Sequence, residues 1–260
     1  MSVYEDFARI YARGDYCEFS RKMGEYLPAA LDALEANPKT ILDVACGEGT
    51  FALVAAEMGY RVTGVDRSEQ MLGFASDSIG RGGADVALVR ADMRALPFAG
   101  GFDLATCWFD SLNYILDPTE LGRVFENVAL ALNEYGLFIF DMNTIHGLAV
   151  NWREHPCYVR KDADGIFEVH RQDYDFETGL ASMHITGFLR DGTTWKRIDE
   201  KHWERGYSQQ DVKKYLLAAG FEILASWGSF RDRSEPANDS PRVWYIAKTG
   251  RSGTGPHKRT

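Results

Sequence analysis

Short apolar runs alternate with amphipathic segments along the first 142 residues of the chain. Helical periodicity is found at about residues 3–36 and 49–58, from Ser68 onward, and near 118–132. Apolar runs of strand length lie between these segments, at 40–45, 61–66, 85–92, 102–109 and 136–142. Buried strands that alternate with amphipathic helices form a parallel sheet with helices on both faces. The pattern therefore predicts an α/β fold with a doubly wound sheet.

The pattern changes in the second half of the chain. Three long runs with the alternation of β-strands, "IFEVHRQDYDF", "LASMHITGFLR" and "TTWKRIDEKHWERGY", extend from Ile166 to Tyr207. The segments "ETG" and "DG" that separate them are typical of hairpin turns. These runs predict a three-stranded antiparallel meander inserted into the α/β pattern. That pattern then resumes with a helix whose N-cap is Ser208 and whose stop is Gly220, followed by two closing strands within 221–230 and 242–249.

The changes of pattern divide the chain into four parts. We expect a helical cap at 1–37, an α/β core formed by 38–150 and 208–249, an antiparallel insertion at 151–207 and a disordered tail at 250–260. The insertion leaves the core after the fifth strand, whose carboxyl end lies on the ligand-binding edge of such a sheet. We therefore predict that the insertion forms a lid over a ligand-binding site at this edge of the sheet. The alternative is that it forms the interface of a homodimer.

Composition and charge argue against several kinds of partner. The 260 residues are 45% hydrophobic and 26% charged, as in ordinary globular proteins. The formal net charge is −9, and no dense stripe of Lys and Arg is found, so nucleic acid is not an expected partner. No run approaches the ~20 apolar residues of a membrane span, so no membrane partner is expected either.

The cysteines do not form a metal-binding pattern. Cys17, Cys46, Cys107 and Cys157 lie far apart, without a C-x-x-C pair or a Cys/His ligand spacing. We therefore expect reduced thiols, no metal site and a cytoplasmic location.

A glycine-rich turn follows the first strand, in the stretch "ILDVACGEGTF" at 41–51. Gly47 and Gly49 fall where the strand passes into a helix, so the backbone there can approach a ligand closely. The segment from Gly47 to Ala52 also has the G-x-G-x-x-A form of a dinucleotide-binding turn, which is a weak signal alone.

Acidic residues at successive strand ends make the signal stronger. Asp43 lies on the first strand, Asp66 ends the second and Asp92 ends the third. Ligands bind at the carboxyl ends of the strands in open α/β sheets. A carboxylate at Asp66 can accept both ribose hydroxyls of either NAD or an adenosyl ligand. Asp92 suits the exocyclic amine of adenine, with the backbone amide of Met93 available to a ring nitrogen, and this favours the adenosyl ligand.

Four segments resemble successive motifs of the class I S-adenosylmethionine-dependent methyltransferases: "LDVACGEGT", "VTGVDRSEQML", "RADMRALPF" and "FDLATCWFDSLNYI". The resemblance implies a seven-stranded, mostly parallel sheet with its last strand antiparallel. It also implies S-adenosyl-L-methionine as cofactor and S-adenosyl-L-homocysteine as product. The insertion resembles the β-rich insertion of some small-molecule methyltransferases. The segment "YARGDY", from Tyr11 to Tyr16, resembles a shortened form of a segment of amino-sugar N-methyltransferases, although it lacks their lysine.

The resemblance and the strand ends together give a set of candidate site residues. The candidate cofactor-binding residues are Tyr11, Asp43, Ala45, Gly47, Gly49, Asp66, Arg67, Met71, Asp92, Met93 and Phe109. The candidate catalytic or substrate-orienting residues are Tyr11, Tyr16, Asp110 and Asn113. Structural alternatives exist for several of them: Asp66 and Asp92 as helix caps, Met71 and Phe109 as core, Tyr11 and Tyr16 as packing for the N-terminal helix.

The function predicted from these residues is methyl transfer to a small-molecule acceptor, with nitrogen favoured over oxygen as the acceptor atom. The sulfonium already makes the methyl group electrophilic, so the protein must mainly align nucleophile, methyl carbon and sulfur for in-line displacement. A base near the acceptor would help an amine to lose its proton, and five histidines lie between residues 146 and 202. The alternatives are an NAD-dependent oxidoreductase and a non-catalytic adenosyl-binding scaffold.

Overall fold

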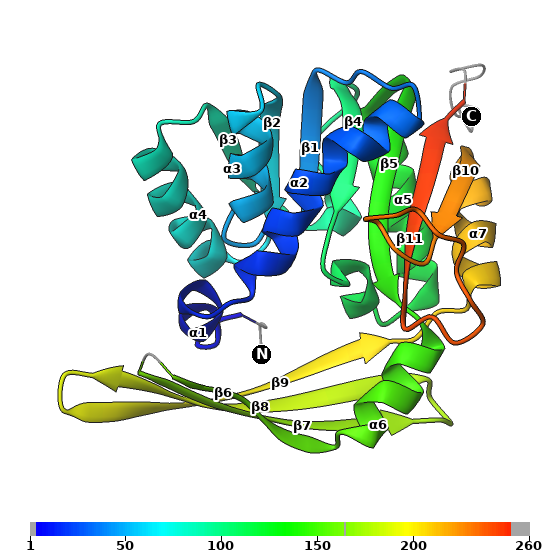
Figure 1. Ribbon diagram of the computed structural model, residues 1–260. Coiled ribbons are helices and arrows are strands. Elements are labelled where there is room, and N and C mark those ends of the chain that lie inside the picture. Colours follow the sequence, from blue (N-terminus) through cyan, green and yellow to red (C-terminus); the bar gives the residue numbers. More distant parts are fainter. Residues whose placement is uncertain (1–3, 164, 251–260) are drawn as a thin grey trace, which may run out of the picture.

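The computed structural model describes residues 4–163 and 165–250, and it contains two sheets (Figure 1). The larger sheet has seven strands in the order β10-β11-β5-β4-β1-β2-β3. Only β11 runs antiparallel to its neighbours in this sheet, as the resemblance implied. The strands are β1 Thr40–Val44, β2 Arg61–Asp66, β3 Val86–Arg90, β4 Phe102–Cys107, β5 Leu132–Asn143, β10 Phe221–Trp227 and β11 Arg242–Thr249.

Helices cover both faces of this sheet, so the predicted doubly wound α/β fold is confirmed. One face buries apolar side chains of α5 and α7, and the other buries those of α2 and α3, which packs in turn against α4. The helices are α1 Ala8–Arg13, α2 Cys17–Ala33, α3 Thr50–Glu57, α4 Glu69–Gly82, α5 Pro118–Ala131, α6 Trp152–Glu154 and α7 Gln209–Ala218.

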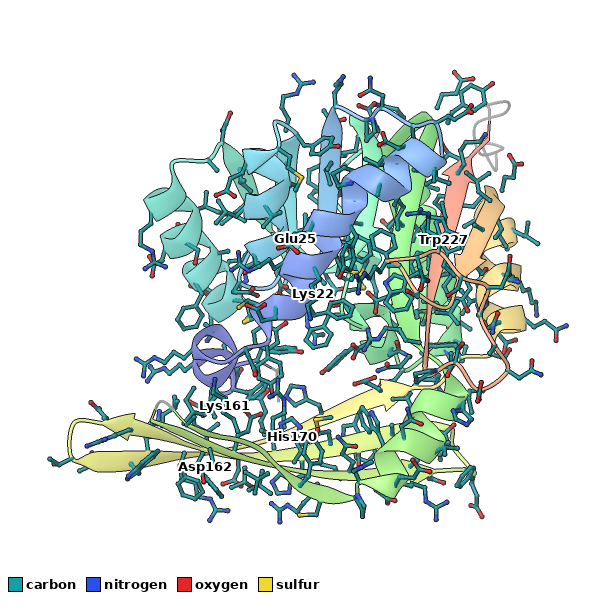
Figure 2. All side chains as sticks on the ribbon, viewed as in Figure 1. Lys22, Glu25, Lys161, Asp162, His170 and Trp227 are labelled. Carbon is teal, nitrogen blue, oxygen red and sulfur yellow. The ribbon has the colours of Figure 1, made fainter. Side chains whose placement is uncertain are left out.

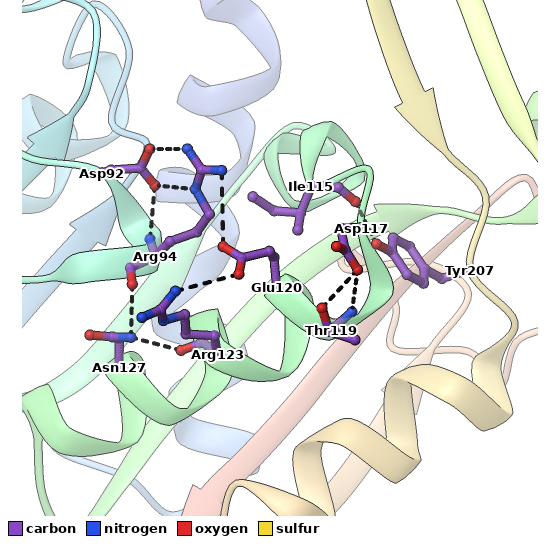
Figure 3. Close-up of polar contacts among 9 residues, drawn as sticks. All are labelled: Asp92, Arg94, Ile115, Asp117, Thr119, Glu120, Arg123, Asn127 and Tyr207. Atoms are coloured by element: carbon purple, nitrogen blue, oxygen red, sulfur yellow. Dashed lines mark hydrogen bonds and ion pairs between the residues drawn. The ribbon is translucent and has the colours of Figure 1, made fainter.

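Local sequence signals explain where these helices begin and end. Ser68 and Ser208 are N-caps whose side chains accept hydrogen bonds from the backbone three residues later. Asp117 caps α5 by accepting a hydrogen bond from the amide of Thr119, two residues later (Figure 3). Pro118 occupies the first helical position. Gly220 follows α7 with a φ of 87°, a left-handed conformation that glycine adopts without strain.

The insertion is a separate antiparallel sheet of four strands in the order β6-β7-β8-β9. The prediction of three strands was therefore wrong. The additional strand, β6, runs along the edge of the sheet, and most of its residues are exposed or half-buried. Since it buries little, its sequence "CYVRKDA" lacks the alternation of apolar and polar residues that revealed the others. The strands are β6 Cys157–Ala163, β7 Ile166–Asp175, β8 Leu180–Asp191 and β9 Thr194–Arg205.

The smaller sheet faces the carboxyl ends of β1, β4 and β5, and α1 lies between it and the core (Figure 1). Phe7, Ile10 and Tyr11 pack there with Ile185 and Ile198 of the sheet in one buried cluster. The contact is close: a Cβ at Gly187 would lie 2.0 Å from Cδ1 of Ile10. A glycine at this point of β8 therefore lets the N-terminal helix rest directly on the sheet.

Other sequence expectations concern what the chain lacks. None of the helices in the described residues is long and apolar enough to cross a membrane. The same residues contain no cluster of His, Cys, Asp or Glu side chains arranged to hold a metal ion. The four cysteines are free thiols. The predicted disordered tail lies, from residue 251 onward, outside the described residues.

Candidate active site

The glycine-rich turn between β1 and α3 is built from left-handed backbone. Ala45, Gly47 and Gly49 have φ values of 58°, 57° and 82°. A Cβ at Gly47 would lie 3.3 Å from Cε of Met71, and one at Gly49 would lie 3.0 Å from Cβ of Ala75 in α4. The left-handed conformation therefore favours glycine at both positions, and at Gly49 the closeness of Ala75 also leaves little room for a Cβ.

Asp66 connects this turn to the end of β2. One carboxylate oxygen accepts a hydrogen bond from the Gly47 amide at 3.0 Å, and the other accepts one from the Ser68 amide at 2.8 Å. The N-cap of α4 is Ser68, so Asp66 is not the cap that was considered as its alternative role. Burial raises the pKa of the Asp66 carboxyl group despite these hydrogen bonds.

Asp92 follows β3 and does serve as a cap. Its carboxylate accepts a hydrogen bond from the Arg94 amide at 2.9 Å and forms an ion pair with the Arg94 guanidinium at 2.6 Å (Figure 3). The ion pair lowers the pKa of Asp92, so its carboxylate is ionised at neutral pH. Glu120 of α5 lies 4.0 Å from the same guanidinium, which helps to hold Arg94 beside the strand end.

These strand ends enclose a cavity of about 940 Å³, part of it open to solvent. Ten of the eleven candidate cofactor-binding residues line it: Tyr11, Asp43, Ala45, Gly47, Asp66, Arg67, Met71, Asp92, Met93 and Phe109. Gly49 does not line the cavity, because it faces α4 from behind the turn. Tyr4, Glu48, Trp108 and Tyr114 also line it and were not identified from the sequence.

A second cavity, of about 760 Å³, lies between the core and the smaller sheet. It is lined from the core side by Asp110 and Arg242 and from the sheet side by side chains of β6, β7, β8 and β9. The candidate residues Tyr16 and Asp110 line this cavity. Both cavities are bordered by the same four aromatic residues: Tyr4, Tyr11, Phe109 and Tyr114.

Asn113 lines neither cavity and is completely buried. Its side-chain amide donates hydrogen bonds to the carbonyl groups of Asn143 and Arg205 and accepts one from the Asn143 amide. These bonds tie the end of β5 to the end of β9. The prediction that Asn113 orients the substrate is therefore not supported, since the backbone occupies its polar atoms.

Arg242 is the centre of the charged wall of the second cavity. Its guanidinium pairs with Asp110 at 2.7 Å and also with Asp141. The Asp141 carboxylate in turn accepts hydrogen bonds from the amides of Phe109 and Asp110, at 2.7 and 3.0 Å. Phe109 and Asp110 have φ values of 57° and 52°, a strained conformation for residues other than glycine. Asp141 and Arg242 thus hold this turn in place between the two cavities.

Glu204 of β9 adds a third buried carboxyl group to this wall. Its carboxyl group accepts a hydrogen bond from the side-chain amide of Asn143 at 2.9 Å. Burial raises the pKa of Glu204 well above its usual value, and the nearby charge of Asp110 raises it further. Neither Arg242 nor Glu204 was identified from the sequence, because their partners are distant along the chain.

Residues 41–136 match the family model described as a methyltransferase domain. A methyltransferase of Geobacillus sp. (strain WCH70) is 32% identical over 219 residues, which cover 81% of this chain and 84% of that protein. The chain belongs to the S-adenosylmethionine-dependent methyltransferases. The alternatives of an NAD-dependent oxidoreductase and a non-catalytic scaffold are therefore wrong.

Solved structures of this methyltransferase family agree with the fold. An S-adenosylmethionine-dependent methyltransferase from Clostridium acetobutylicum has 29% identity and a TM-score of 0.82, over 96% of this chain and 100% of that chain. The amino pentose methyltransferase CalS10 from Micromonospora echinaspora, solved with S-adenosylmethionine bound, has 18% identity and a TM-score of 0.70, over 95% and 97% of the two chains. The cofactor of this methyltransferase is S-adenosyl-L-methionine, as its family and its similarity to the Clostridium acetobutylicum enzyme show.

Two buried acidic oxygens in the first cavity fit this cofactor. Oδ2 of Asp43 and Oε1 of Glu48 have no hydrogen-bond partner in the described part of the chain. Burial raises the pKa of Asp43 to about 8 and also raises that of Glu48. Such groups are costly to bury without a partner. The α-ammonium group of S-adenosylmethionine would supply one, which suits this methyltransferase.

The other cofactor contacts of the methyltransferase stay predictions. Asp66 would accept the ribose hydroxyls, and Asp92 with the Met93 amide would contact adenine, as all three residues line the cavity. The bound cofactor supplies an electrophilic methyl group. The chain itself supplies the fixed carboxylates, the turn that admits the ligand and the shared aromatic border.

Asp66→Ala is expected to weaken S-adenosylmethionine binding by about 1.5–3 kcal/mol, because it removes charge-assisted hydrogen bonds. The substitution also removes the hydrogen bond that the Asp66 carboxylate accepts from the backbone amide of Gly47. Calorimetric titration of the methyltransferase measures the effect, with NAD as a ligand that should not bind. Asp77→Ala, on the exposed side of α4, is the matched control and should bind like the parent. Equal affinity of Asp66→Ala and the parent would show that Asp66 only supports the turn.

Proposed function

We propose that this methyltransferase transfers the methyl group to a nitrogen atom of a small, amine-bearing acceptor held in the second cavity. The observation that carries the proposal is the border shared by the two cavities, formed by Tyr4, Tyr11, Phe109 and Tyr114. A methyl group presented from the first cavity would cross this border to reach an acceptor in the second. In-line displacement requires such an arrangement of nucleophile, methyl carbon and sulfur.

The size and the walls of the second cavity favour a small molecule. A volume of about 760 Å³ lies within the range of small-molecule sites. Its roof is the smaller sheet, whose side chains Met183 and Ile185 line the cavity. His170 of the same sheet also lines it and is labelled in Figure 2. We propose that this roof is the predicted lid, which excludes water from the sulfonium during transfer.

The chemistry of the lining favours an amine. Asp110 presents a carboxylate to the cavity, and the side chains of five tyrosines also line it: Tyr4, Tyr11, Tyr16, Tyr114 and Tyr158. Acidic groups and aromatic faces both attract a protonated or partly charged amine. The two arginines of the lining already have acidic partners, since Arg160 pairs with Asp15 and Arg242 with Asp110. These pairs make the cavity less suited to a free carboxylate or phosphate.

The names of distant structural relatives add one acceptor class to consider. CalS10 is described as an amino pentose methyltransferase, and KedS8 from Streptoalloteichus, at 20% identity and a TM-score of 0.69, as a sugar N-methyltransferase. Similarity at this level shows a common fold. The resemblance of Tyr11 to Tyr16 to the N-terminal segment of such enzymes places amino sugars among the acceptors to be tested.

Free thiols support a location for the enzyme. All four cysteines lack a disulfide partner, and Cys157 is exposed. Since exposed thiols persist in reducing compartments, we propose that the protein acts in the cytoplasm.

A methyl-transfer screen tests the proposed function. The parent enzyme is incubated with S-adenosylmethionine and a panel of alkyl amines, amino acids, amino sugars, phenols and carboxylic acids, and release of S-adenosylhomocysteine is followed. We expect turnover with one or more amines, and mass spectrometry of the product should place the methyl group on nitrogen. Asp66→Ala serves as the control for cofactor-dependent release. Turnover confined to phenols or carboxylic acids would overturn the choice of nitrogen.

A further inference from the structure

The core-facing side of the smaller sheet carries the pattern Glu-x-His twice. Glu168 and His170 lie on β7, and Glu200 and His202 lie on β9. All four side chains are buried. His170 and Glu200 are both paired with Ile185 of the intervening strand, so the two patterns are offset by two residues along the sheet.

The two histidines differ in what they contact across the cavity. Nδ1 of His202 lies 2.8 Å from the hydroxyl of Tyr114, which borders both cavities. His170 instead contacts the hydroxyls of Tyr16 and Tyr158, each at 3.2 Å. Tyr16 and Tyr158 line the second cavity but not the cofactor cavity. Only the pattern on β9 therefore leads to the border across which a methyl group would pass.

The contacts of Glu200 determine which nitrogen of His202 carries the proton. Oε1 of Glu200 lies 2.8 Å from Nε2 of His202, and the same carboxylate accepts hydrogen bonds from the backbone amides of Tyr4 and Phe7. Burial raises the pKa of Glu200, but the hydrogen bonds from His202 and the two amides outweigh it, so the pKa lies below its usual value. An ionised Glu200 needs a donor at Nε2, which leaves Nδ1 of a neutral His202 to accept a proton from Tyr114.

We propose that Glu200, His202 and Tyr114 form a proton relay that takes the proton released by the acceptor nitrogen. This inference rests on the proposed amine acceptor. The N–H bond of the acceptor ammonium breaks, its electron pair stays on nitrogen, and the proton bonds to Oη of Tyr114. The original O–H bond of Tyr114 breaks, and that proton bonds to Nδ1 of His202. The resulting imidazolium is stabilised by the Glu200 carboxylate, and the excess proton leaves to solvent after turnover.

The relay is needed because only an unprotonated amine can attack the methyl group. A simple alkyl amine resembles lysine, whose pKa is ~10.4, and is therefore mostly protonated at neutral pH. Four other titratable or charged groups lie near the relay: Tyr4, Asp110, Glu204 and Arg242. The hydroxyl of Tyr4 lies 3.2 Å from that of Tyr114. Asp110 and Arg242 pair with each other. Burial raises the pKa of Glu204 well above its usual value, which favours its protonated form, and a protonated carboxyl group cannot accept this proton.

His202→Gln is the variant that tests the relay. The glutamine amide can keep a hydrogen bond to Glu200, which also holds the N-terminal segment, but it cannot accept a proton. With the amine of highest turnover in the panel, kcat at pH 7 is expected to fall on the order of 10²-fold, the lower range for acid–base catalysis. The loss should shrink as the pH rises toward 10, where the free amine predominates. Tyr114→Phe should shift the pH profile in the same direction, and the double variant should add little.

His170→Gln is the matched control on β7, where the side chain makes the equivalent contact with Glu168. It lines the acceptor cavity, so we expect a changed KM for the amine and a pH profile of kcat like that of the parent. A purely structural defect in His202→Gln would lower kcat equally at all pH values, and that result would overturn the relay.

A measurement without acceptor separates the relay from the proposed function. Nitrogen NMR of the complex with S-adenosylhomocysteine reports the tautomer of His202, and we expect the proton on Nε2. A neutral ring with its proton on Nδ1 would overturn the relay whatever the acceptor is. A parent enzyme that methylates no amine overturns the proposed function. A parent that methylates an amine, with an unchanged pH profile in His202→Gln, overturns the relay alone.

Discussion

Replacing residues 157–205 by a short Gly/Ser linker is expected to lower methyl-transfer turnover by about 10³-fold or more, while affinity for S-adenosylmethionine falls by no more than about tenfold. These residues comprise the four strands of the smaller sheet. They supply one wall of the acceptor cavity and none of the residues that line the cofactor cavity. Without that wall the acceptor is no longer positioned, and water reaches the sulfonium.

The limited loss of cofactor affinity has a structural reason. Of the residues that line the cofactor cavity, only Tyr4 and Tyr11 belong to the N-terminal segment that packs on the smaller sheet. Turnover and calorimetric titration measure the two effects separately, and light scattering shows whether the oligomeric state changes. Retained turnover would contradict the lid, and a change from dimer to monomer would support the alternative interface.

A milder variant guards against a deletion that fails to fold. Met183 lines the acceptor cavity from β8, and Met183→Trp should reduce turnover by filling the cavity while cofactor affinity stays that of the parent. Ser182 directly precedes Met183 on β8, and successive side chains of a strand point to opposite faces of the sheet. Ser182→Trp is therefore the matched control, with turnover like that of the parent.

Arg242→Met is expected to reduce the free energy of unfolding by about 3–5 kcal/mol, because it leaves Asp110 and Asp141 buried without their common cation. Both side chains are largely buried, with exposed fractions of 11% for Asp110 and 0% for Asp141. Urea unfolding followed by fluorescence measures the loss. Arg90→Met is the matched control, since the Arg90–Glu69 ion pair is exposed and should contribute less than about 1 kcal/mol.

The pH dependence of this loss has a definite sign. Burial already raises the pKa of Asp141 in the parent, with Arg242 opposing the shift, and removing the guanidinium raises it further. A carboxyl group with a raised pKa binds its proton more tightly in the folded state, so stability falls as the pH rises through that range. Arg242→Met should therefore lose less stability at pH 5 than at pH 8. Equal losses at both pH values would show that packing, and not charge, is the main contribution.

Most of the residues that line the cofactor cavity could be predicted from local sequence patterns. Gly47 and Asp66 are close in sequence, and the strand, turn and helix that position them follow from short-range patterns and caps such as Ser68. The carboxyl ends of parallel strands meet at one edge of the sheet, so strand order alone brought Asp43, Asp66 and Asp92 to one cavity. Gly49 was the exception, because its contact with α4 depends on helix packing.

The acceptor half depended on contacts that no local pattern encodes. Arg242 and Asp110 are 132 residues apart, and Tyr114 and His202 are 88 apart. Arg242 and Asp110 meet because β11 and β4 flank β5 in the larger sheet, and Tyr114 and His202 meet because the smaller sheet packs against the core. Both arrangements depend on the summed burial of side chains from many elements. The same packing directed Asn113 away from the cavity and gave β6 its place at an edge. Alternation along β7 and β9 could predict that Glu and His share a face. Only the tertiary structure showed that His202 contacts Tyr114, which borders the cofactor cavity, because register and docking are set by long-range contacts.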